Sequence, residues 1–271
     1  MARVLVTGGT GTLGRAILPA LQAAGHDVSV LSRSAGPSSD TGVPRRVGDL
    51  RTGAGLAEAL QGVDSVVHLA SDARHAREVD VDGTARLSGA AATAGCGHLL
   101  LISIVGCDVV PFGYYRAKAT AEQVALHGPV PASVLRATQF HELAVRLAQT
   151  VTLGPVAVAP RGLRFAPVDV RDVADRLVRA VGDGPGGRLP DLGGPEVLSL
   201  ADVAVTWAQA RGRRRPRAVH LPAWGGMLRA LAAGANLPGP EADRGRRTLE
   251  AWVAEHRPAA APMAGSRWSA S

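Results

Sequence analysis

A glycine-rich stretch between an apolar run and a helical pattern limits how this chain can fold more than any other feature. Residues 3–7, RVLVT, form a short β-branched run, and residues 12–25 carry a helical pattern. Where the two meet, three glycines have the spacing Gly8-x-x-Gly11-x-x-Gly14, the last of them inside the helical pattern. A strand before such glycines and a helix after them are typical of a parallel sheet that binds a dinucleotide.

Each of the three glycines has its own task in such a turn. Gly8 allows the tight turn, Gly11 lets the backbone approach a pyrophosphate, and Gly14 lets the helix pack closely on the strand. The pyrophosphate then lies at the positive end of the helix dipole. The alternative is an ordinary strand-to-helix turn, but the flanking strand and helix favour a dinucleotide site.

The first two-thirds of the chain continue the alternation of strand and helix patterns. Further strands are expected at 27–32, 44–49, 64–70, 98–104 and 132–137, and helices at 56–62 and 73–95. Short apolar strands separated by helices indicate a parallel sheet that is covered on both faces. We therefore predict a Rossmann-type, doubly wound α/β core over residues 1–138.

After Thr138 the pattern is looser. Short strands are expected in 156–160 and 163–170, and helices at 170–184, 198–212 and 240–256. Ser199 is expected to cap one of these helices, with Asp202 completing a capping box. We predict a smaller substrate-binding α/β lobe at 139–257, interleaved with the core, and a disordered tail at 258–271.

Composition narrows the class of partner. The net charge of +7 suits nucleic acid or an anionic cofactor. The densest basic run, residues 211–217, lacks interleaved aromatic residues and is interpreted as a solvated turn, so no nucleic-acid partner is expected. Cys96 and Cys107 lack metal-ligand spacing, so no metal is expected. With no candidate signal peptide or membrane span, we expect a cytoplasmic monomer or homodimer that acts on a small molecule.

The residues after the second expected strand bear on the choice of dinucleotide. An acidic residue there would bind the ribose 2′-hydroxyl and indicate NAD. This chain has Ser32 and Arg33 instead, and Arg15 directly follows the last glycine of the turn. Such cations favour a 2′-phosphate, so NADP(H) is expected in preference to NAD(H). The alternative is that Arg33 is an exposed loop residue in an arginine-rich chain.

The sequence GYYRAK at 113–118 brings two scarce residue types together. Tyr114 and Tyr115 are the only tyrosines, and Lys118 is the only lysine among 30 basic residues. Four residues apart on a helix, Tyr114 and Lys118 lie on one face. A nearby ammonium is expected to lower the pKa of the phenol, which would make Tyr114 a general acid for a carbonyl oxygen that receives a hydride. Tyr115 is the reserve candidate, and core-edge packing of both rings is the alternative.

Several stretches together resemble the short-chain dehydrogenase/reductase superfamily, and most closely its atypical NmrA-like branch. They are TGGTGTLGR, VVHLA, VDVDGTARL, LLISIVG, GYYRAKATAE, LRATQFHE and, further on, VDVRDVAD and GGPEVLSLADVA. The resemblance covers roughly residues 3–257. It implies a Rossmann-type fold, an NAD(P)(H) cofactor and, for many members, a reductase activity.

The resemblance also implies a role for each matching residue. The cofactor is expected at Gly8, Gly11, Thr12, Leu13, Gly14, Arg33, Asp49, Leu50, Leu69, Ala70, Ser71, Lys118, Thr138 and Phe140. Ser103, Tyr114 and Lys118 match the catalytic positions. Phe140 and His141 would face the substrate, although a buried structural histidine is the alternative for His141, as it is for His68.

The chain departs from the family pattern at Asp80, where extended members often have asparagine, and in the short gap between Ser103 and Tyr114. Three functions are compatible with the motifs. We expect an NADP(H)-dependent reductase of a carbonyl or activated double bond, and its arginine-rich, aromatic-poor composition fits a bacterium. A non-catalytic NADP-sensing regulator is disfavoured by the tyrosine–lysine pair, and an NAD(P)-dependent epimerase or dehydratase by Arg33.

Overall fold

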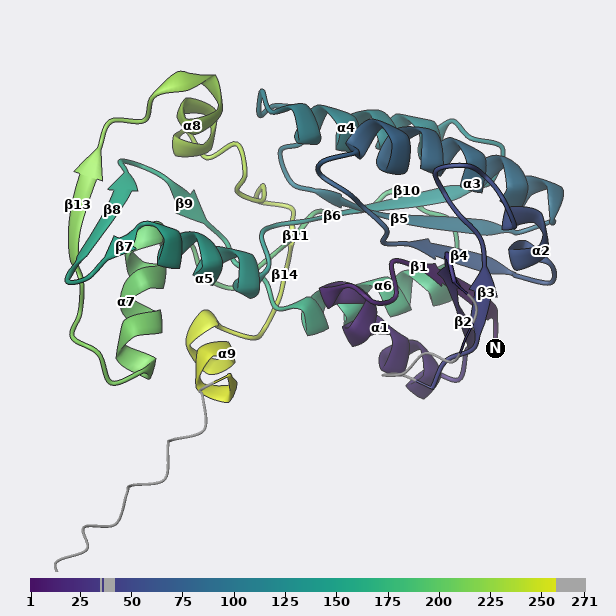
Figure 1. The fold of residues 1–271 in the computed structure, drawn as a ribbon, viewed down its shortest axis with the longest axis horizontal. Coiled ribbons are helices and arrows are strands. Elements are labelled where there is room, and N and C mark those ends of the chain that lie inside the picture. Colours follow the sequence, from purple (N-terminus) through teal and green to yellow (C-terminus); the bar gives the residue numbers. More distant parts are fainter. Residues whose placement is uncertain (35, 37–41, 257–271) are drawn as a thin grey trace, which may run out of the picture.

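A parallel sheet with helices on both faces forms the centre of the computed structural model, which describes residues 1–34, 36 and 42–256 (Figure 1). The strand order is β14-β11-β6-β5-β4-β1-β2-β3, with β10 beside β6. The strands are β1 Arg3–Thr7, β2 Asp27–Ser32, β3 Arg45–Val47, β4 Ser65–His68, β5 His98–Ile104, β6 Ala132–Ala137, β10 Gly187–Arg188, β11 Leu192–Gly193 and β14 Asp243–Arg244. The predicted doubly wound fold is confirmed, and the strand order reverses between β1 and β4, which is where such sheets bind ligands.

The apolar strands are buried because helices cover each face of the sheet. Helices α1 (Thr12–Ala23) and α6 (Val170–Asp183) enclose a first hydrophobic cluster. Helices α2 (Leu56–Leu60), α3 (Asp82–Thr93) and α4 (Gly113–Leu126) enclose a second one. Burial on both faces explains why these strands are continuous apolar runs.

The helix expected at 73–95 differs at its start. Residues 73–76 precede it, and the first turn is the π-helix η1, Arg77–Val81, which runs directly into α3. Such π turns are frequent at functional sites. This one carries Asp80, whose side chain is buried at the edge of the site described below.

A third hydrophobic cluster lies among the later elements, beside the main sheet (Figure 1). Its elements and their neighbours are α5 His141–Thr150, α7 Leu200–Ala210, α8 Gly225–Ala232, α9 Leu249–Glu255, β7 Thr152–Leu153, β8 Val156–Pro160, β9 Arg164–Phe165, β12 Leu198–Ser199 and β13 Arg217–Leu221. The capping box of Ser199 and Asp202 is confirmed at the start of α7. The division at residue 138 stays a prediction, and the expected tail at 258–271 lies outside the described residues.

The expected helix at 240–256 is wrong in its first half. Residues 240–248 contain β14, and only α9 is helical, beginning after Thr248, whose hydroxyl accepts from the amide of Ala251. Helices α5 and α8 and strand β13 had no distinct sequence signal. Contacts with neighbouring elements stabilise them instead. Strand β13, for example, pairs with β8.

Removing a buried side chain from α6 should destabilise the fold. Leu177 is fully buried in the first cluster, so Leu177→Ala is expected to lower the free energy of unfolding by about 2–5 kcal/mol. On α5, Leu143 is 43% exposed, and Leu143→Ala should cost no more than about 0.5 kcal/mol. Urea unfolding measures both, and equal losses would contradict this packing.

Candidate functional site

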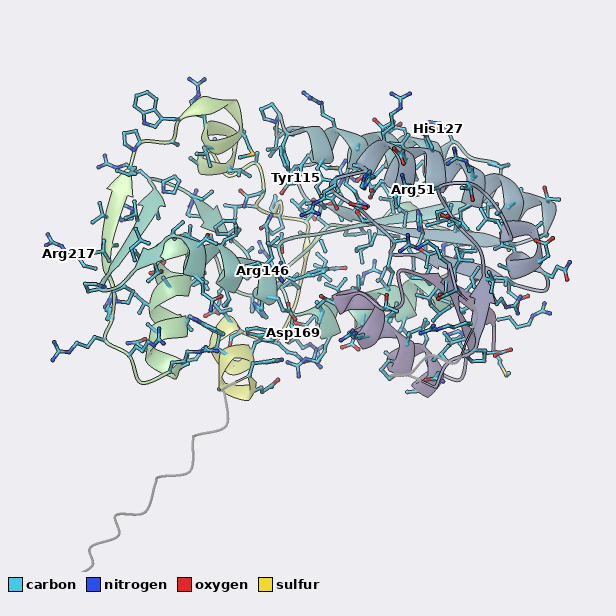
Figure 2. All side chains as sticks on the ribbon, in the orientation of Figure 1. Arg51, Tyr115, His127, Arg146, Asp169 and Arg217 are labelled. Atoms are coloured by element: carbon cyan, nitrogen blue, oxygen red, sulfur yellow. The ribbon has the colours of Figure 1, made fainter. Side chains whose placement is uncertain are left out.

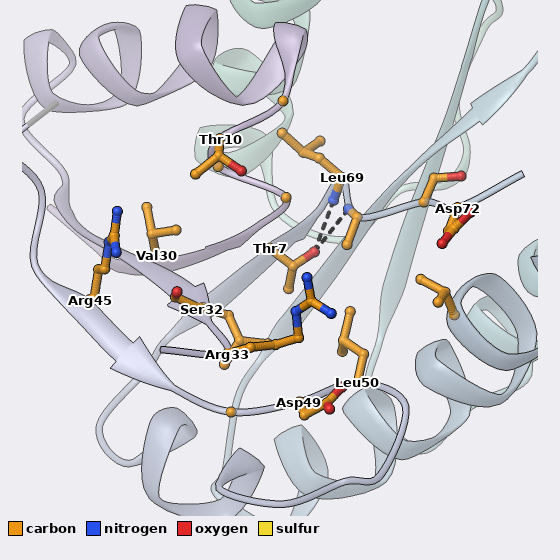
Figure 3. Close-up of a pocket in the computed structure, with 18 of the residues that line it drawn as sticks. Thr7, Thr10, Val30, Ser32, Arg33, Arg45, Asp49, Leu50, Leu69 and Asp72 are labelled. Atoms are coloured by element: carbon orange, nitrogen blue, oxygen red, sulfur yellow. Dashed lines mark hydrogen bonds between the residues drawn. The ribbon is translucent and has the colours of Figure 1, made fainter. Parts of the chain in front are cut away.

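A pocket of about 510 Å³ opens at the carboxyl ends of β1, β2 and β4, at the reversal of strand order (Figure 3). Eight of the residues predicted to bind the cofactor line it, namely Gly8, Gly11, Arg33, Asp49, Leu50, Leu69, Ala70 and Ser71. Lining residues that the sequence did not indicate include Arg45, Arg51, Asp72 and Val79. Leu13 and Gly14 are buried beneath the pocket at the start of α1.

The glycine turn fits a bound pyrophosphate. Gly8 has a φ of +69°, and a Cβ there would lie 2.7 Å from the backbone nitrogen of Ala70. At Gly14 a Cβ would collide with the carbonyl oxygen of Gly8, so the helix approaches the turn closely. At Gly11 it would meet only that same oxygen, at 3.3 Å, so the rest of the space beside Gly11 is left for a ligand.

The first turn of α1 adds a favourable charge. Gly11 is its N-cap, no described side chain caps the exposed amides, and the first turn holds no acidic residue. These amides form the positive end of the helix dipole and are suited to phosphate oxygens. The Nε of Arg15 donates to the carbonyl of Thr10 at 3.1 Å, which holds this cation beside the turn.

Cations and a neutral hydroxyl gather at the end of the pocket beside β2. Figure 3 shows Ser32, Arg33 and Arg45 here, with Asp49 and Leu50 along the neighbouring loop. The carboxylate of Asp49 accepts from the amide of Arg51 at 2.8 Å and so holds its own loop. The described residues at the end of β2, Ser32, Arg33 and Ser34, are not acidic, whereas an NAD-binding site would have a carboxylate there.

A buried hydrogen-bond chain joins β1 and β4 just below the pocket. The hydroxyl of Thr7 accepts from two backbone amides after β4, each at 3.1 Å (dashed in Figure 3), so its proton goes to His68 Nδ1 at 2.7 Å. His68 Nε2–H then donates to the hydroxyl of Thr84 at 3.1 Å, which donates to the carbonyl of Asp80. Burial, together with the charge of Lys118, lowers the pKa of His68 to about 3, so the ring is neutral.

Tyr114 reaches the pocket through Ser71. The phenol oxygen lies 2.7 Å from Ser71 Oγ, which in turn donates to Asp80 Oδ1 at 2.6 Å. Lys118 Nζ lies 3.4 Å from the same carboxylate oxygen and donates to the carbonyl of Ile102 at 2.9 Å. The structure therefore brings Tyr114 and Lys118 together around a carboxylate.

The expected lowering of the Tyr114 pKa is wrong. Burial of the ring raises the pKa of Tyr114, and the charge of Asp80 adds to that effect, while the hydrogen bond between Tyr114 and Ser71 opposes it. Lys118 is paired with Asp80, so its charge is already compensated at short range. The phenol is accordingly protonated at neutral pH.

Ser103 is not brought to Tyr114. Its hydroxyl is buried, 3.8 Å from the sulfur of Cys107, and next to Glu122, which holds the guanidinium of Arg136 through two bonds of 2.6 and 2.7 Å. The catalytic match of Ser103 therefore gains no support from the geometry. Ser71, which was predicted only as a cofactor contact, is the serine that bonds to the phenol.

The residues after β6 that were predicted to contact the cofactor or substrate make contacts within the protein interior. Thr138 is buried and donates to the carbonyl of Ala166 at 2.5 Å, and His141 is buried against Trp252 with Nε2 3.2 Å from the carbonyl of Arg247. His141 is therefore a buried structural histidine, which was the alternative to a substrate contact. Burial lowers the pKa of His141. Phe140 is half-buried and packs on the first cluster.

Tyr115, in the first turn of α4, has partners of its own (Figure 2). A hydrogen bond to the side chain of Gln139 partly offsets the rise in the pKa of Tyr115 that burial causes. Its ring meets Phe112 edge-on at 5.9 Å. Its ring also meets that of Tyr114 edge-on at 6.4 Å, so the two tyrosines are neighbours with different hydrogen-bond partners.

A family model described as NAD(P)H-binding matches residues 8–183, from the glycine turn to the end of α6. The chain belongs to this NAD(P)H-binding family. The NAD(P)(H)-binding family and the Rossmann-type fold that the sequence resemblance implies are thereby confirmed. The match covers the strands and helices that build the pocket.

Two relatives of this NAD(P)H-binding protein are named as reductases. It is 31% identical over 216 residues to the (4-alkanoyl-5-oxo-2,5-dihydrofuran-3-yl)methyl phosphate reductase of Streptomyces griseus, covering 78% of this chain and 74% of the relative. It is 29% identical over 219 residues to the NAD(P)H azoreductase of Xenophilus azovorans, covering 78% and 74%. The chain is an NAD(P)-dependent oxidoreductase.

A solved structure shares the fold. The NADPH-dependent quinone oxidoreductase of Escherichia coli, in complex with NADPH, has a TM-score of 0.78 over 93% of this chain and 99% of that one, at 18% identity. Across the residues described here, no helix combines the length and the apolar character that crossing a bilayer requires.

The buried neutral His68 should make stability depend on pH. Below about pH 6.5 the unfolded chain binds a proton that the native ring takes up only near its pKa of about 3. The contribution of the neutral His68 ring to the free energy of unfolding is therefore fully present above about pH 6.5. It falls by up to about 1.4 kcal/mol for each pH unit below that. His68→Gln should lose less stability than the wild type between about pH 7.5 and about pH 5.5.

Urea unfolding at the two pH values measures this difference. The exposed His127, which follows the last residue of α4 (Figure 2), supplies the control, since His127→Gln should keep the wild-type dependence. Buried His98 and His141, whose pKa values are also lowered, retain part of the slope. An unchanged slope in His68→Gln would mean that the ring is not held neutral.

Proposed function

We propose that the protein is an NADP(H)-dependent reductase that transfers a hydride to a carbonyl or activated double bond of a small organic molecule. The proposal depends on one observation above all: the protonated phenol of Tyr114 is bonded to Ser71, which itself lines the cofactor pocket. A proton donor beside a dinucleotide site is the arrangement that carbonyl reduction needs. We keep the cytoplasmic location and the monomeric or homodimeric state as predictions.

The division of chemistry follows from the charges. When bound, the nicotinamide supplies the hydride, which adds to the substrate carbon while the oxygen becomes more negative. Tyr114 would donate its proton to that oxygen and regain one from solvent. Because the pKa of Tyr114 is raised, it carries the proton at neutral pH, as an acid must.

The substrate class has limited support from the relatives. The Streptomyces griseus relative is named for a substrate with an oxo group and an alkanoyl group, and the Xenophilus azovorans relative for azo reduction. The first name gives a substrate that contains carbonyl groups and a ring double bond, and the second gives reduction of an azo compound. We therefore propose a carbonyl or an activated double bond for this chain.

The preference for NADP(H) has its support at the end of β2. Ser32 stands where an NAD site would have a carboxylate, and Arg33 and Arg45 line the same end of the pocket. Guanidinium groups bind phosphate through paired hydrogen bonds. A 2′-phosphate would therefore be attracted to this end of the pocket.

Arg33→Ala should weaken NADPH binding selectively. Loss of one charge-assisted phosphate contact is expected to raise the NADPH Kd by about tenfold or more and to change the NADH Kd by less than about twofold. Fluorescence titration of each cofactor measures both constants. Arg146→Ala, an exposed arginine on α5 away from the pocket (Figure 2), is the control and should change neither.

Tighter binding of NADH than NADPH by the wild type would overturn the NADP(H) assignment. An equal effect of Arg33→Ala on both cofactors would also count against it, because the side chain would then contact a part that they share.

Tyr114→Phe should lose most of the catalytic rate. Removing a general acid typically costs about 10²–10⁴ in rate, so kcat is expected to fall by at least about 100-fold while the NADPH Kd stays within about threefold. NADPH oxidation is followed with a panel of ketones, quinones and enones. Tyr115→Phe is the matched control and should retain kcat within about threefold.

The opposite pattern, an active Tyr114→Phe with an inactive Tyr115→Phe, would transfer the acid role by one residue. NADPH binding with no turnover of any compound in a broad panel would favour the alternative, a non-catalytic NADP-sensing regulator.

A further inference from the structure

A buried ion pair lies directly behind Tyr114. Asp80 is 1% exposed and Lys118 is 2% exposed, and their charged atoms are 3.4 Å apart. Charges removed from water are costly unless each has a partner. Besides Asp80, the Lys118 ammonium has the carbonyl of Ile102, so both of its recorded acceptors belong to the protein interior.

The direction of the hydrogen bonds around Ser71 follows from counting protons. Its hydroxyl has one proton, which it donates to Asp80 Oδ1 at 2.6 Å. The Ser71 oxygen must then accept from the phenol of Tyr114 at 2.7 Å. A phenolate at position 114 would leave two acceptors facing each other unless Ser71 released Asp80.

The second oxygen of Asp80 is also in use. The amide of Asp72 donates to Asp80 Oδ2 at 3.2 Å, which ties the carboxylate to the loop after β4 that carries Ser71. Asp80 thus holds the loop, the serine and the lysine at once.

We propose that Asp80 is a positioning residue that compensates the charge of Lys118 and, through Ser71, holds Tyr114 as an un-ionised phenol with its proton in place. The inference rests on the proposed role of Tyr114 as the proton donor. According to this inference, the phenol of Tyr114 stays un-ionised because position 80 carries a carboxylate. An asparagine there would leave the Lys118 ammonium uncompensated.

Other charged or titratable groups near the phenol do not favour a phenolate. On the loop after β4, Asp72 is negative and is paired with His75 at 3.0 Å. On α4 itself, Tyr115 is neutral and also disfavours ionisation of its neighbour. Lys118 is thus the cation that would stabilise a phenolate, and Asp80 faces it.

The two tyrosines of the chain allow a direct test. In Tyr115→Phe, Tyr114 is the only phenol, so the near-ultraviolet absorbance of phenolate reports on it alone. We expect little phenolate up to about pH 10, the ordinary midpoint of a phenol. Adding Asp80→Asn should lower the midpoint by about one pH unit or more, since Lys118 is then uncompensated.

A further variant assigns the cause. Tyr115→Phe with both Asp80→Asn and Lys118→Met removes the two charges together, and its midpoint should return to within about half a unit of the Tyr115→Phe protein. Circular dichroism at each pH confirms that the chain stays folded.

Two results would overturn the proposal. One is a midpoint below about pH 9 in Tyr115→Phe alone, which would mean that Lys118 dominates despite Asp80. The other is an unchanged midpoint on adding Asp80→Asn. If Asp80→Asn does not fold, the titration of Tyr115→Phe alone can still overturn the proposal. No substrate or cofactor enters the titration, so an inactive protein with the expected midpoints would contradict only the proposed function.

Discussion

The hydrogen-bond chain from Thr7 through His68 and Thr84 to Asp80 connects the two halves of the site. It begins at the residue before the glycine turn and ends at the carbonyl of Asp80, whose carboxylate faces Lys118 and Ser71. Each link has one possible direction because Thr7 already accepts two amides. The positions of the cofactor cradle and of the proposed acid are therefore mechanically coupled through buried, fully satisfied polar groups.

Burial of the Tyr114 ring, together with the same carboxylate, explains why the protonation of Tyr114 differs from what residue spacing suggests. Spacing places an ammonium one helical turn from a phenol, and an isolated pair of this kind would favour phenolate. Burial of the ring raises the pKa of Tyr114 instead, and Asp80, which is far away in sequence, adds to that rise while it pairs with Lys118. The outcome suits a reductase, since the group that gives up a proton must first hold one.

Local patterns predicted the core well, because its strands and glycines are dictated by short-range rules. Strands β1, β2, β5 and β6 have the expected bounds, and the reversal at β1 and β4 puts the glycine turn beside Arg33. Such short-range rules do not predict contacts between segments that are far apart in the sequence. Ser71 rather than Ser103 meets Tyr114, because the face of the strand and the conformation of a loop decide this, and the surroundings of Asp80 depend on a π turn.

Transfer of a labelled hydride tests the central claim most directly. Protein mixed with NADPH deuterated at the nicotinamide C4 and with each compound of a ketone, quinone and enone panel would be analysed by mass spectrometry of the products. The account predicts deuterium on the reduced carbon of at least one carbonyl or enone product when C4 is labelled on the transferring face. Tight binding of NADPH with no deuterium in any product, whichever face is labelled, would contradict it.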